Sequence, residues 1–272
     1  MLRQRFLTAL ALAAVLGVVV LALPPIATVI LLSVVILGGA WEWSAFFGAA
    51  TLAKRLGFVA LIALLLPVSW LATEDTAALR MLLLGVMTWW VIALLWLMRA
   101  PERVSPLSVT IAGVFALVPS WLALVRVRLD IADGAIWTLF ALVLIVAADT
   151  GAYFAGRQFG RVKLAPRVSP GKTWEGVLGG VALCLLVAGI GSQVLAVPLA
   201  AMLFSALLVA AFSIVGDLTE SMLKRHAGVK DSGRVLPGHG GILDRIDSVT
   251  AGAPVLLWCL LWLGLERIEV LK

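Results

Sequence analysis

Charged residues are scarce in this chain of 272 amino acids: only 13% are Asp, Glu, Lys or Arg, whereas 62% are hydrophobic. Soluble domains are about half apolar and a quarter charged, so this composition excludes an ordinary soluble protein. One bilayer span needs about 20 apolar residues, and the apolar content suffices for about nine spans with short connections. We therefore expect no separate water-soluble domain.

Cysteine is also rare, with only Cys184 and Cys259, and both lie inside apolar runs. They form no CxxC pair, so neither a disulfide framework nor a zinc site is indicated. Internal repeats and low-complexity tracts are missing as well. The formal net charge of +6 would suggest nucleic acid in a soluble domain, but here the basic residues must first be assigned to a membrane side, and we expect no nucleic-acid partner.

Long apolar runs are abundant, and each ends at a charge or at a Pro or Gly break. The first run follows Arg3 and Arg5, as in a signal peptide, but it is longer than the usual signal core, so we expect it to be retained. The expected fold is an all-α integral membrane protein, a polytopic bundle of about nine transmembrane helices. These helices are predicted near residues 6–23, 26–44, 56–72, 79–98, 107–124, 133–148, 176–196, 198–216 and 250–265.

Nine spans would divide the basic residues unequally between the two membrane faces. Sixteen of the 21 Lys and Arg fall on the face that carries the N-terminus, and five fall on the opposite face. Cationic flanks are retained in the cytoplasm during insertion. The pattern therefore predicts a cytoplasmic N-terminus and a C-terminus outside.

Polar residues are concentrated in the second half of the chain. Residues 1–148 are apolar runs joined by short turns, whereas 149–175 and 217–249 are long polar segments on the predicted cytoplasmic face, with seven of the 15 acidic residues. We therefore divide the chain into N-terminal transmembrane helices, 1–148, and a C-terminal transmembrane catalytic region, 149–272, with its active site on the cytoplasmic face.

Three acidic residues of this region have the spacing of metal ligands. Asp244 and Asp247 are three residues apart, so on a helix their carboxylates share one face, with Cβ atoms about 5 to 6 Å apart. Asp217, which follows Gly216 at the end of an apolar run, would add an oxygen from an adjacent helix end. An oxygen-only set favours Mg²⁺ or a similar ion over zinc.

Basic residues and glycines are interleaved with these acids. Such cations can bind phosphate oxygens, and glycines let the backbone approach a ligand closely. The combination favours phosphoryl or nucleotidyl transfer. The alternative, for any one of these residues, is simple pairing with other side chains and lipid headgroups. The residues concerned are Lys224, Arg225, Lys230, Arg234, Arg245, Gly238, Gly240 and Gly241.

The first polar segment contains Gly171-Lys172-Thr173, which resembles part of a P-loop. A P-loop needs a glycine five residues before Gly171, where Pro166 stands, and a preceding strand, so we reject that interpretation. Lys172 remains a predicted phosphate contact. Asp149 follows a long apolar run and is expected to face the site, because acids at membrane depth usually turn inward.

Two other polar residues are ambiguous. Glu42 lies between Trp41 and Trp43 near the cytoplasmic end of the second expected span, where an aromatic belt explains the two tryptophans. A carboxylate is costly at that depth, and facing an internal cavity is the functional alternative. His239, within Pro-Gly-His-Gly-Gly, fits a turn and a ligand contact equally well.

One long motif resembles a known family. Residues 221–247 read Ser-x-x-Lys-Arg-x4-Lys-Asp-x-Gly-x2-Leu-Pro-x-His-Gly-Gly-x2-Asp-Arg-x-Asp. This pattern resembles the signature of the phosphatidate cytidylyltransferases, also called CDP-diacylglycerol synthases. The segments 149–153 and 169–176 are similar to that family too, whereas the first 148 residues resemble it only as generic membrane helices.

The resemblance implies transfer of a cytidylyl group from CTP to phosphatidate in a bacterial inner membrane, giving CDP-diacylglycerol and pyrophosphate for phospholipid biosynthesis. It implies Mg²⁺, with a monovalent cation such as K⁺ as a second ion, and leaves a homodimer open. The predicted catalytic residues are Asp217, Lys224, Arg225, Lys230, Asp231, Asp244, Arg245 and Asp247, of which Asp217, Asp244 and Asp247 would hold the metal. The predicted substrate-binding residues are Asp149, Ser169, Lys172, Thr173, Glu175, His239, Gly240 and Gly241.

Two alternatives stand beside this hypothesis. A related membrane enzyme would use CTP on a polyprenyl or other lipid acceptor, and the lipid consumed would distinguish the two. A transporter would spread its acids along pore-facing helices, whereas here most spans are free of charge and the acids gather on one face.

Overall fold

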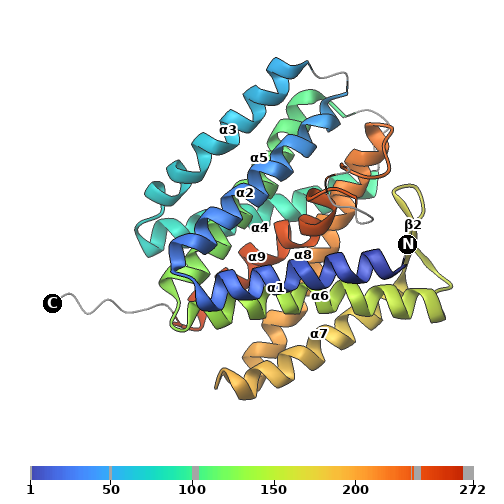
Figure 1. The fold of residues 1–272 in the computed structure, drawn as a ribbon. Helices are drawn as coiled ribbons and strands as arrows, with labels where there is room; N and C mark the ends of the chain where they lie inside the picture. The colour runs from blue at the N-terminus through green and yellow to red at the C-terminus, as the bar shows by residue number, and fades with distance from the viewer. Residues whose placement is uncertain (1, 49–50, 100–103, 234, 236–239, 266–272) are drawn as a thin grey trace.

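The computed structural model describes residues 2–48, 51–99, 104–233, 235 and 240–265, with side chains from residue 10 onward. Within these ranges the chain forms nine α-helices (Figure 1). A short 3₁₀ helix, η1 (Ser44–Phe47), and one small hairpin complete the fold. The α-helices are α1 (Leu2–Ala22), α2 (Pro25–Trp43), α3 (Leu52–Ala72), α4 (Thr76–Arg99), α5 (Pro106–Asp130), α6 (Gly134–Phe159), α7 (Trp174–Val194), α8 (Leu199–His226) and α9 (Leu243–Trp262).

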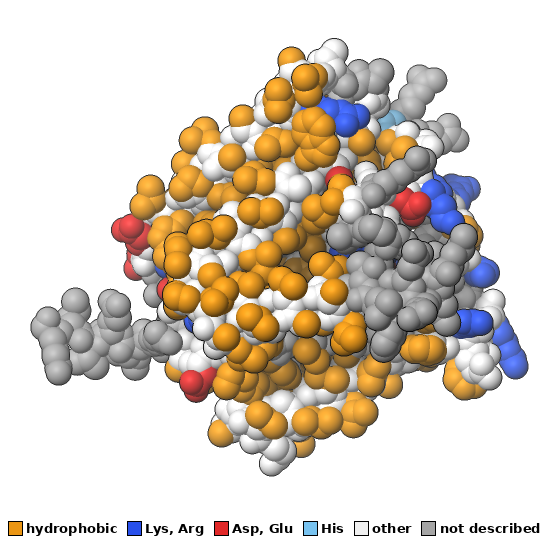
Figure 2. All heavy atoms as spheres, in the orientation of Figure 1, with side chains coloured by type: hydrophobic (Ala, Val, Ile, Leu, Met, Phe, Trp, Pro, Cys, Tyr) orange, Lys and Arg blue, Asp and Glu red, His pale blue; other side chains and the backbone are white. Residues whose placement is uncertain are grey.

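The helices α2 to α8, seven among the described residues, are each long and apolar enough to cross a membrane. Large apolar side chains are exposed along α2, α3, α4 and α7, and they form much of the surface in Figure 2. Hydrocarbon solvates such a surface, and helices satisfy their own backbone hydrogen bonds there. The protein is therefore an all-α, multi-pass membrane protein, as the sequence predicts.

Several helix boundaries differ from the expected ones. Two of the predicted spans end just before an acidic residue. In the structure, however, α6 continues through Asp149 to Phe159, and α8 continues through Asp217 to His226. Both carboxylates find interior partners, so the helix does not have to end where the charge begins. The predicted boundary between residues 148 and 149 consequently lies inside α6.

The polar segment after α6 forms an antiparallel hairpin, which the all-α prediction did not include. Strand β1 (Lys163–Ala165) pairs with β2 (Ser169–Thr173), which leads directly into α7. Thr173 caps α7, because its Oγ1 accepts a hydrogen bond from the N–H of Gly176 at 3.1 Å. The hairpin therefore ends in a fixed position at the start of α7.

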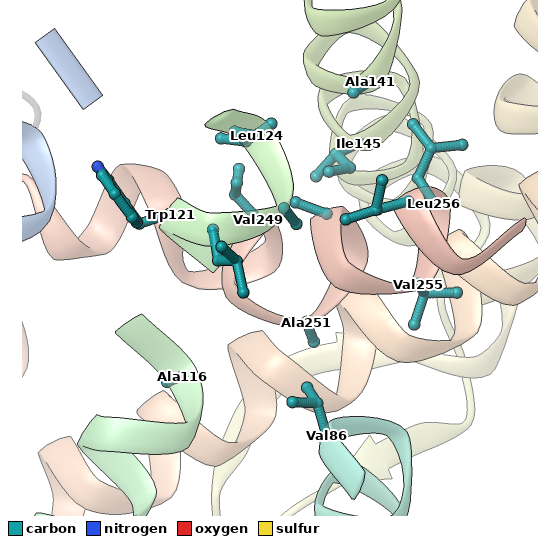
Figure 3. Packing of buried hydrophobic residues seen from close by; sticks show 14 of the residues in the cluster. Val86, Ala116, Trp121, Leu124, Ala141, Ile145, Val249, Ala251, Val255 and Leu256 are labelled. Atoms are coloured by element: carbon teal, nitrogen blue, oxygen red, sulfur yellow. The ribbon is translucent and has the colours of Figure 1, made fainter. Parts of the chain in front are cut away.

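The helices α5 and α9 form the centre of the bundle. In the most apolar stretch of 18 residues in α5, 72% of the residues are buried. The corresponding value for α3, at the periphery, is 22%. Nearly every residue of α9 from Ser248 to Leu261 is buried as well. Figure 3 shows the packing of α9 against α4, α5 and α6 through Val249, Ala251, Val255 and Leu256. The first residues of α9 carry the acidic motif, so this motif is attached to a helix that is buried at the centre of the bundle.

Close packing of α6 on α7 depends on glycine. A Cβ at Gly180 would lie 2.5 Å from the carbonyl oxygen of Ala148, and one at Gly151 would collide with the backbone of Gly179. Small residues let membrane helices approach until their backbones touch. This contact places Asp149, next to Ala148, close to the start of α7.

Basic residues on the face predicted to lie outside have structural partners. Arg126 is buried, lies 3.7 Å from the ring centroid of Trp70, and pairs with Asp130 at 2.9 Å. Arg80 donates a hydrogen bond to the carbonyl oxygen of Leu261 at 3.1 Å. These two cations connect helices to one another. This structural role explains their presence on the face predicted to lie outside, where the positive-inside rule disfavours basic residues.

The orientation in the membrane is tested by cysteine labelling. In a chain in which Cys184 and Cys259 are replaced by Ala, the exposed positions Arg161→Cys and Lys230→Cys are expected to react with an impermeant maleimide only from the cytoplasmic side. Ala132→Cys, in the turn between α5 and α6, is expected to react only from outside. The reason is the unequal distribution of Lys and Arg. Labelling of Lys230→Cys from outside would reverse the predicted orientation.

Candidate active site

A cavity of about 500 Å³ lies between α6, α7, α8, the hairpin and the start of α9. One part of its wall is apolar, with Val177, Val181 and Ile214, and another part is charged. The predicted site residues on the wall are Asp149, Ser169, Lys172, Thr173, Asp217, Asp244 and Asp247. Segments separated by about a hundred residues of sequence thus meet at one site.

Asp217 lies in the middle of α8, where it faces the hairpin. Its Oδ2 forms an ion pair with the Nζ of Lys172 on β2. Its Oδ1 accepts a hydrogen bond from the Oγ of Ser221, one helical turn later, at 3.3 Å. Lys172 is partly exposed to the cavity, so its ammonium group can hold Asp217 and still reach a bound anion.

Asp244, in the first turn of α9, has a partner for each oxygen. Oδ1 accepts a hydrogen bond from the Nζ of Lys224 at 2.7 Å. Oδ2 accepts hydrogen bonds from the backbone N–H groups of Ser232 at 3.0 Å and Gly241 at 2.8 Å. Asp244 thereby holds Ser232 and Gly241 close to its own carboxylate.

Lys224 connects two carboxylates in the interior. Its Nζ lies 2.9 Å from Oε1 of Glu220 and 2.7 Å from Oδ1 of Asp244. The exposed fractions of the three side chains are only 11%, 2% and 9% for Lys224, Glu220 and Asp244. Charges so well removed from water need a partner, so this triad holds α8 and α9 together.

Ser248 links the remaining two acids of the cavity. Its Oγ donates a hydrogen bond to Oδ1 of Asp149 at 2.9 Å, and its N–H donates to Oδ1 of Asp247 at 2.7 Å. Asp149, Asp217 and Glu220 are all near enough to Asp247 for their negative charges to repel it. Carboxylates therefore outnumber the lysines on the cavity wall, and a cation bound there would relieve the repulsion.

The metal ligands remain a prediction. Asp217, Asp244 and Asp247 line the same cavity, and an all-oxygen donor set fits Mg²⁺. However, among the described side chains, no three His, Cys, Asp or Glu are arranged as a ready-made metal site. Lys172 and Lys224 occupy part of the coordination capacity of Asp217 and Asp244, so a metal would have to share these two carboxylates with the lysines.

Other predicted residues lie away from the cavity wall. Glu175 accepts hydrogen bonds from the backbone N–H groups of Arg161 and Val162 and so shapes the turn before β1. Arg225 donates to the carbonyl oxygen of Val168 at 3.4 Å. Lys230, Asp231 and Arg245 are exposed on the surface. Gly240 has a positive φ of 80° beside Asp244, and His239 lies outside the described residues.

The sequence interpretation did not single out Glu220 or Ser248 as parts of the site. The spacing of Glu220 and Lys224 was an available signal, because residues four apart on a helix form ion pairs. Ser248 offered no such signal, since its partner Asp149 is 99 positions away in the sequence. Arg157 also lines the cavity, and the sequence interpretation gave it no role.

Comparison with known proteins identifies the family. The model of the cytidylyltransferase family matches residues 3–263. The chain belongs to this family. A phosphatidate cytidylyltransferase of Pseudomonas aeruginosa is 40% identical over 96% of this chain and 99% of its own length. One of Haemophilus influenzae is 37% identical over 93% and 96%. One of Bacillus subtilis is 46% identical over 47% of this chain and 48% of its own.

Membership of the cytidylyltransferase family extends to the N-terminal helices. The family match begins at residue 3, and the two long alignments cover both halves of the chain. The first 148 residues, which the sequence motifs characterised only as generic membrane helices, are therefore part of the family pattern.

Proposed function

We propose that this protein transfers CMP from CTP to phosphatidate, releasing pyrophosphate and forming CDP-diacylglycerol, in a bacterial cytoplasmic membrane. The observation that carries the proposal is the cavity in which the carboxylates of Asp149, Asp217, Asp244 and Asp247 meet Lys172. It opens among apolar membrane helices at the end that carries the hairpin. A polar headgroup and a polyphosphate can meet there while acyl chains stay in hydrocarbon.

In this reaction an oxygen of the lipid phosphate attacks the α-phosphorus of CTP. The new P–O bond forms as the bond from the α-phosphorus to the bridging oxygen of the β-phosphate breaks, and pyrophosphate leaves with that electron pair. A phosphate monoester is already anionic, so no strong general base is needed. The main task of the protein is to offset repulsion between two anions.

Lys172 is well placed for that task. It lies on the cavity wall with a side chain that is 26% exposed, and Asp217 holds its ammonium group in place. A positioned cation lowers the free energy of charge that develops on the phosphates. Lys224, behind Asp244, acts instead by orienting that carboxylate.

Mg²⁺ fits the oxygen donors of Asp217, Asp244 and Asp247, and when bound it would neutralise phosphate charge and orient the reacting groups. K⁺ as a second ion and a homodimer remain parts of the same proposal. The family resemblance supports K⁺ and leaves a homodimer open.

The assay that tests the function uses purified protein in detergent, radiolabelled CTP, Mg²⁺ and one lipid at a time. Phosphatidate is expected to yield labelled CDP-diacylglycerol with equimolar pyrophosphate. Polyprenyl phosphate and diacylglycerol serve as matched lipids. Labelling of polyprenyl phosphate alone would identify a different acceptor, and no labelled lipid with any acceptor would refute the proposal.

A further inference from the structure

Glu42 of α2 is a buried carboxylate that the proposed chemistry does not use. Only 4% of the residue is exposed. Its Oε2 accepts hydrogen bonds from the Oγ of Ser232 at 3.1 Å and from the N–H of Leu243 at 2.8 Å. Both partners are about 190 to 200 positions further along the chain. They belong to the loop and helix that carry Asp244.

The contact with Leu243 caps α9. The first N–H groups of a helix have no partner within the helix, and a negative charge near them is favourable. The residue at the N-cap position, Ile242, makes no side-chain hydrogen bond to the helix. Glu42 supplies the missing acceptor from another part of the chain, at the helix end that presents Asp244 and Asp247.

The contact with Ser232 extends to Asp244 itself. The Oγ of Ser232 accepts a hydrogen bond from the N–H of Asp244 at 3.3 Å, and the N–H of Ser232 donates to Oδ2 of Asp244 at 3.0 Å. Glu42 therefore fixes the hydroxyl group through which the loop holds Asp244.

Two glycines provide the space for Glu42. A Cβ at Gly233 would collide with the Glu42 carboxylate, and the three nearest atoms all belong to Glu42. At Gly241, a Cβ would meet Glu42 and Ser232. The end of α2 that carries Glu42 is held against α5, because Nε1 of the neighbouring Trp43 donates a hydrogen bond to the carbonyl oxygen of Val109 at 3.0 Å.

We propose that Glu42 is a positioning residue: it caps α9 and holds Ser232 beside the start of this helix so that Asp244 and Asp247 face the cavity. Helix α2 thereby contributes to the active site although it carries none of the signature residues. The kinetic part of this inference rests on the proposed function, whereas the capping part does not.

The conservative variant Glu42→Gln keeps the volume and an accepting oxygen of the side chain and removes only its negative charge. In Glu42→Gln the amide oxygen can take the place of Oε2, and the amide nitrogen can take that of Oε1, which has no hydrogen-bond partner among the described atoms. We expect Glu42→Gln to keep kcat within about threefold of wild type, and Glu42→Ala to lower kcat at least about 10-fold. Glu74→Ala, exposed at the opposite end, is the matched control and should be unchanged.

A double-mutant cycle gives a second readout. Gly233→Ala should lower kcat in the wild-type background because its Cβ displaces the Glu42 carboxylate, but it should add little in the Glu42→Ala background, where that carboxylate is gone. Independent, multiplicative effects of the two changes, or a Glu42→Ala variant with wild-type kcat, would overturn the inference. Gly233→Ala and Glu42→Gln keep it testable if Glu42→Ala does not fold.

Hydrogen exchange separates this inference from the proposed function. In Glu42→Ala the backbone amides of residues 243–246 are expected to exchange faster than in wild type, whether or not the protein makes CDP-diacylglycerol. An inactive wild type with this exchange pattern would refute the function and leave the capping intact. Unchanged exchange would refute the capping.

Discussion

Asp217→Asn, Asp244→Asn and Asp247→Asn are each expected to lower turnover at least about 100-fold, a loss of a few kcal/mol of transition-state stabilisation. Asn keeps the size and polarity of Asp but removes the charge that balances Mg²⁺ and orders the lysines. At Asp217 the ion pair with Lys172 is lost. At Asp244 the loss is compounded, because both oxygens face donors and an amide NH₂ would meet one in either orientation.

The measurement is a Mg²⁺ titration of CDP-diacylglycerol formation with each purified variant. Weaker metal binding should appear as a higher Mg²⁺ midpoint as well as a lower plateau. Asp133→Asn is the control: Asp133 is exposed, has a positive φ of 53° that Asn also tolerates, and lies at the opposite end of α6. Full activity with an unshifted midpoint in Asp244→Asn and Asp247→Asn would exclude these carboxylates as metal ligands.

Lys224→Met is expected to reduce both activity and stability. Without the ammonium group, Glu220 and Asp244 face each other as buried carboxylates with no counter-charge from Lys224. Breaking such a buried arrangement costs about 3 to 5 kcal/mol. Asp244 would also lose one of its three donors, so we expect turnover to fall at least about 100-fold, as for Asp244→Asn.

Thermal unfolding in detergent measures the stability change, and the CTP assay measures turnover. Lys54→Met removes an exposed lysine at the start of α3 and should unfold as wild type does. Adding Glu220→Gln to Lys224→Met should recover part of the stability, because one of the two uncompensated charges is removed. If Lys224→Met unfolded at the wild-type temperature, Lys224 could not be the link between α8 and α9.

The membrane fold and most charged residues of the cavity were predictable from local patterns. Apolar runs of about 20 residues identify spans without knowledge of their neighbours, because the bilayer itself is the partner. The three-residue spacing of Asp244 and Asp247 placed both on one helix face, and both line the cavity. The helix ends were less predictable, because the partners that let α6 and α8 continue past Asp149 and Asp217 lie on other elements.

The sequence by itself determined the all-α membrane class, the concentration of charged groups after residue 148 and the family motifs. Only the tertiary structure decided which distant groups pair: Lys172 with Asp217, Lys224 with Asp244, and Glu42 with the start of α9. The physical reason is the range of the interactions. Helix periodicity and hydropathy act between residues a few positions apart, whereas a cap supplied across 201 positions leaves no local pattern and exists only when α2 packs against α9.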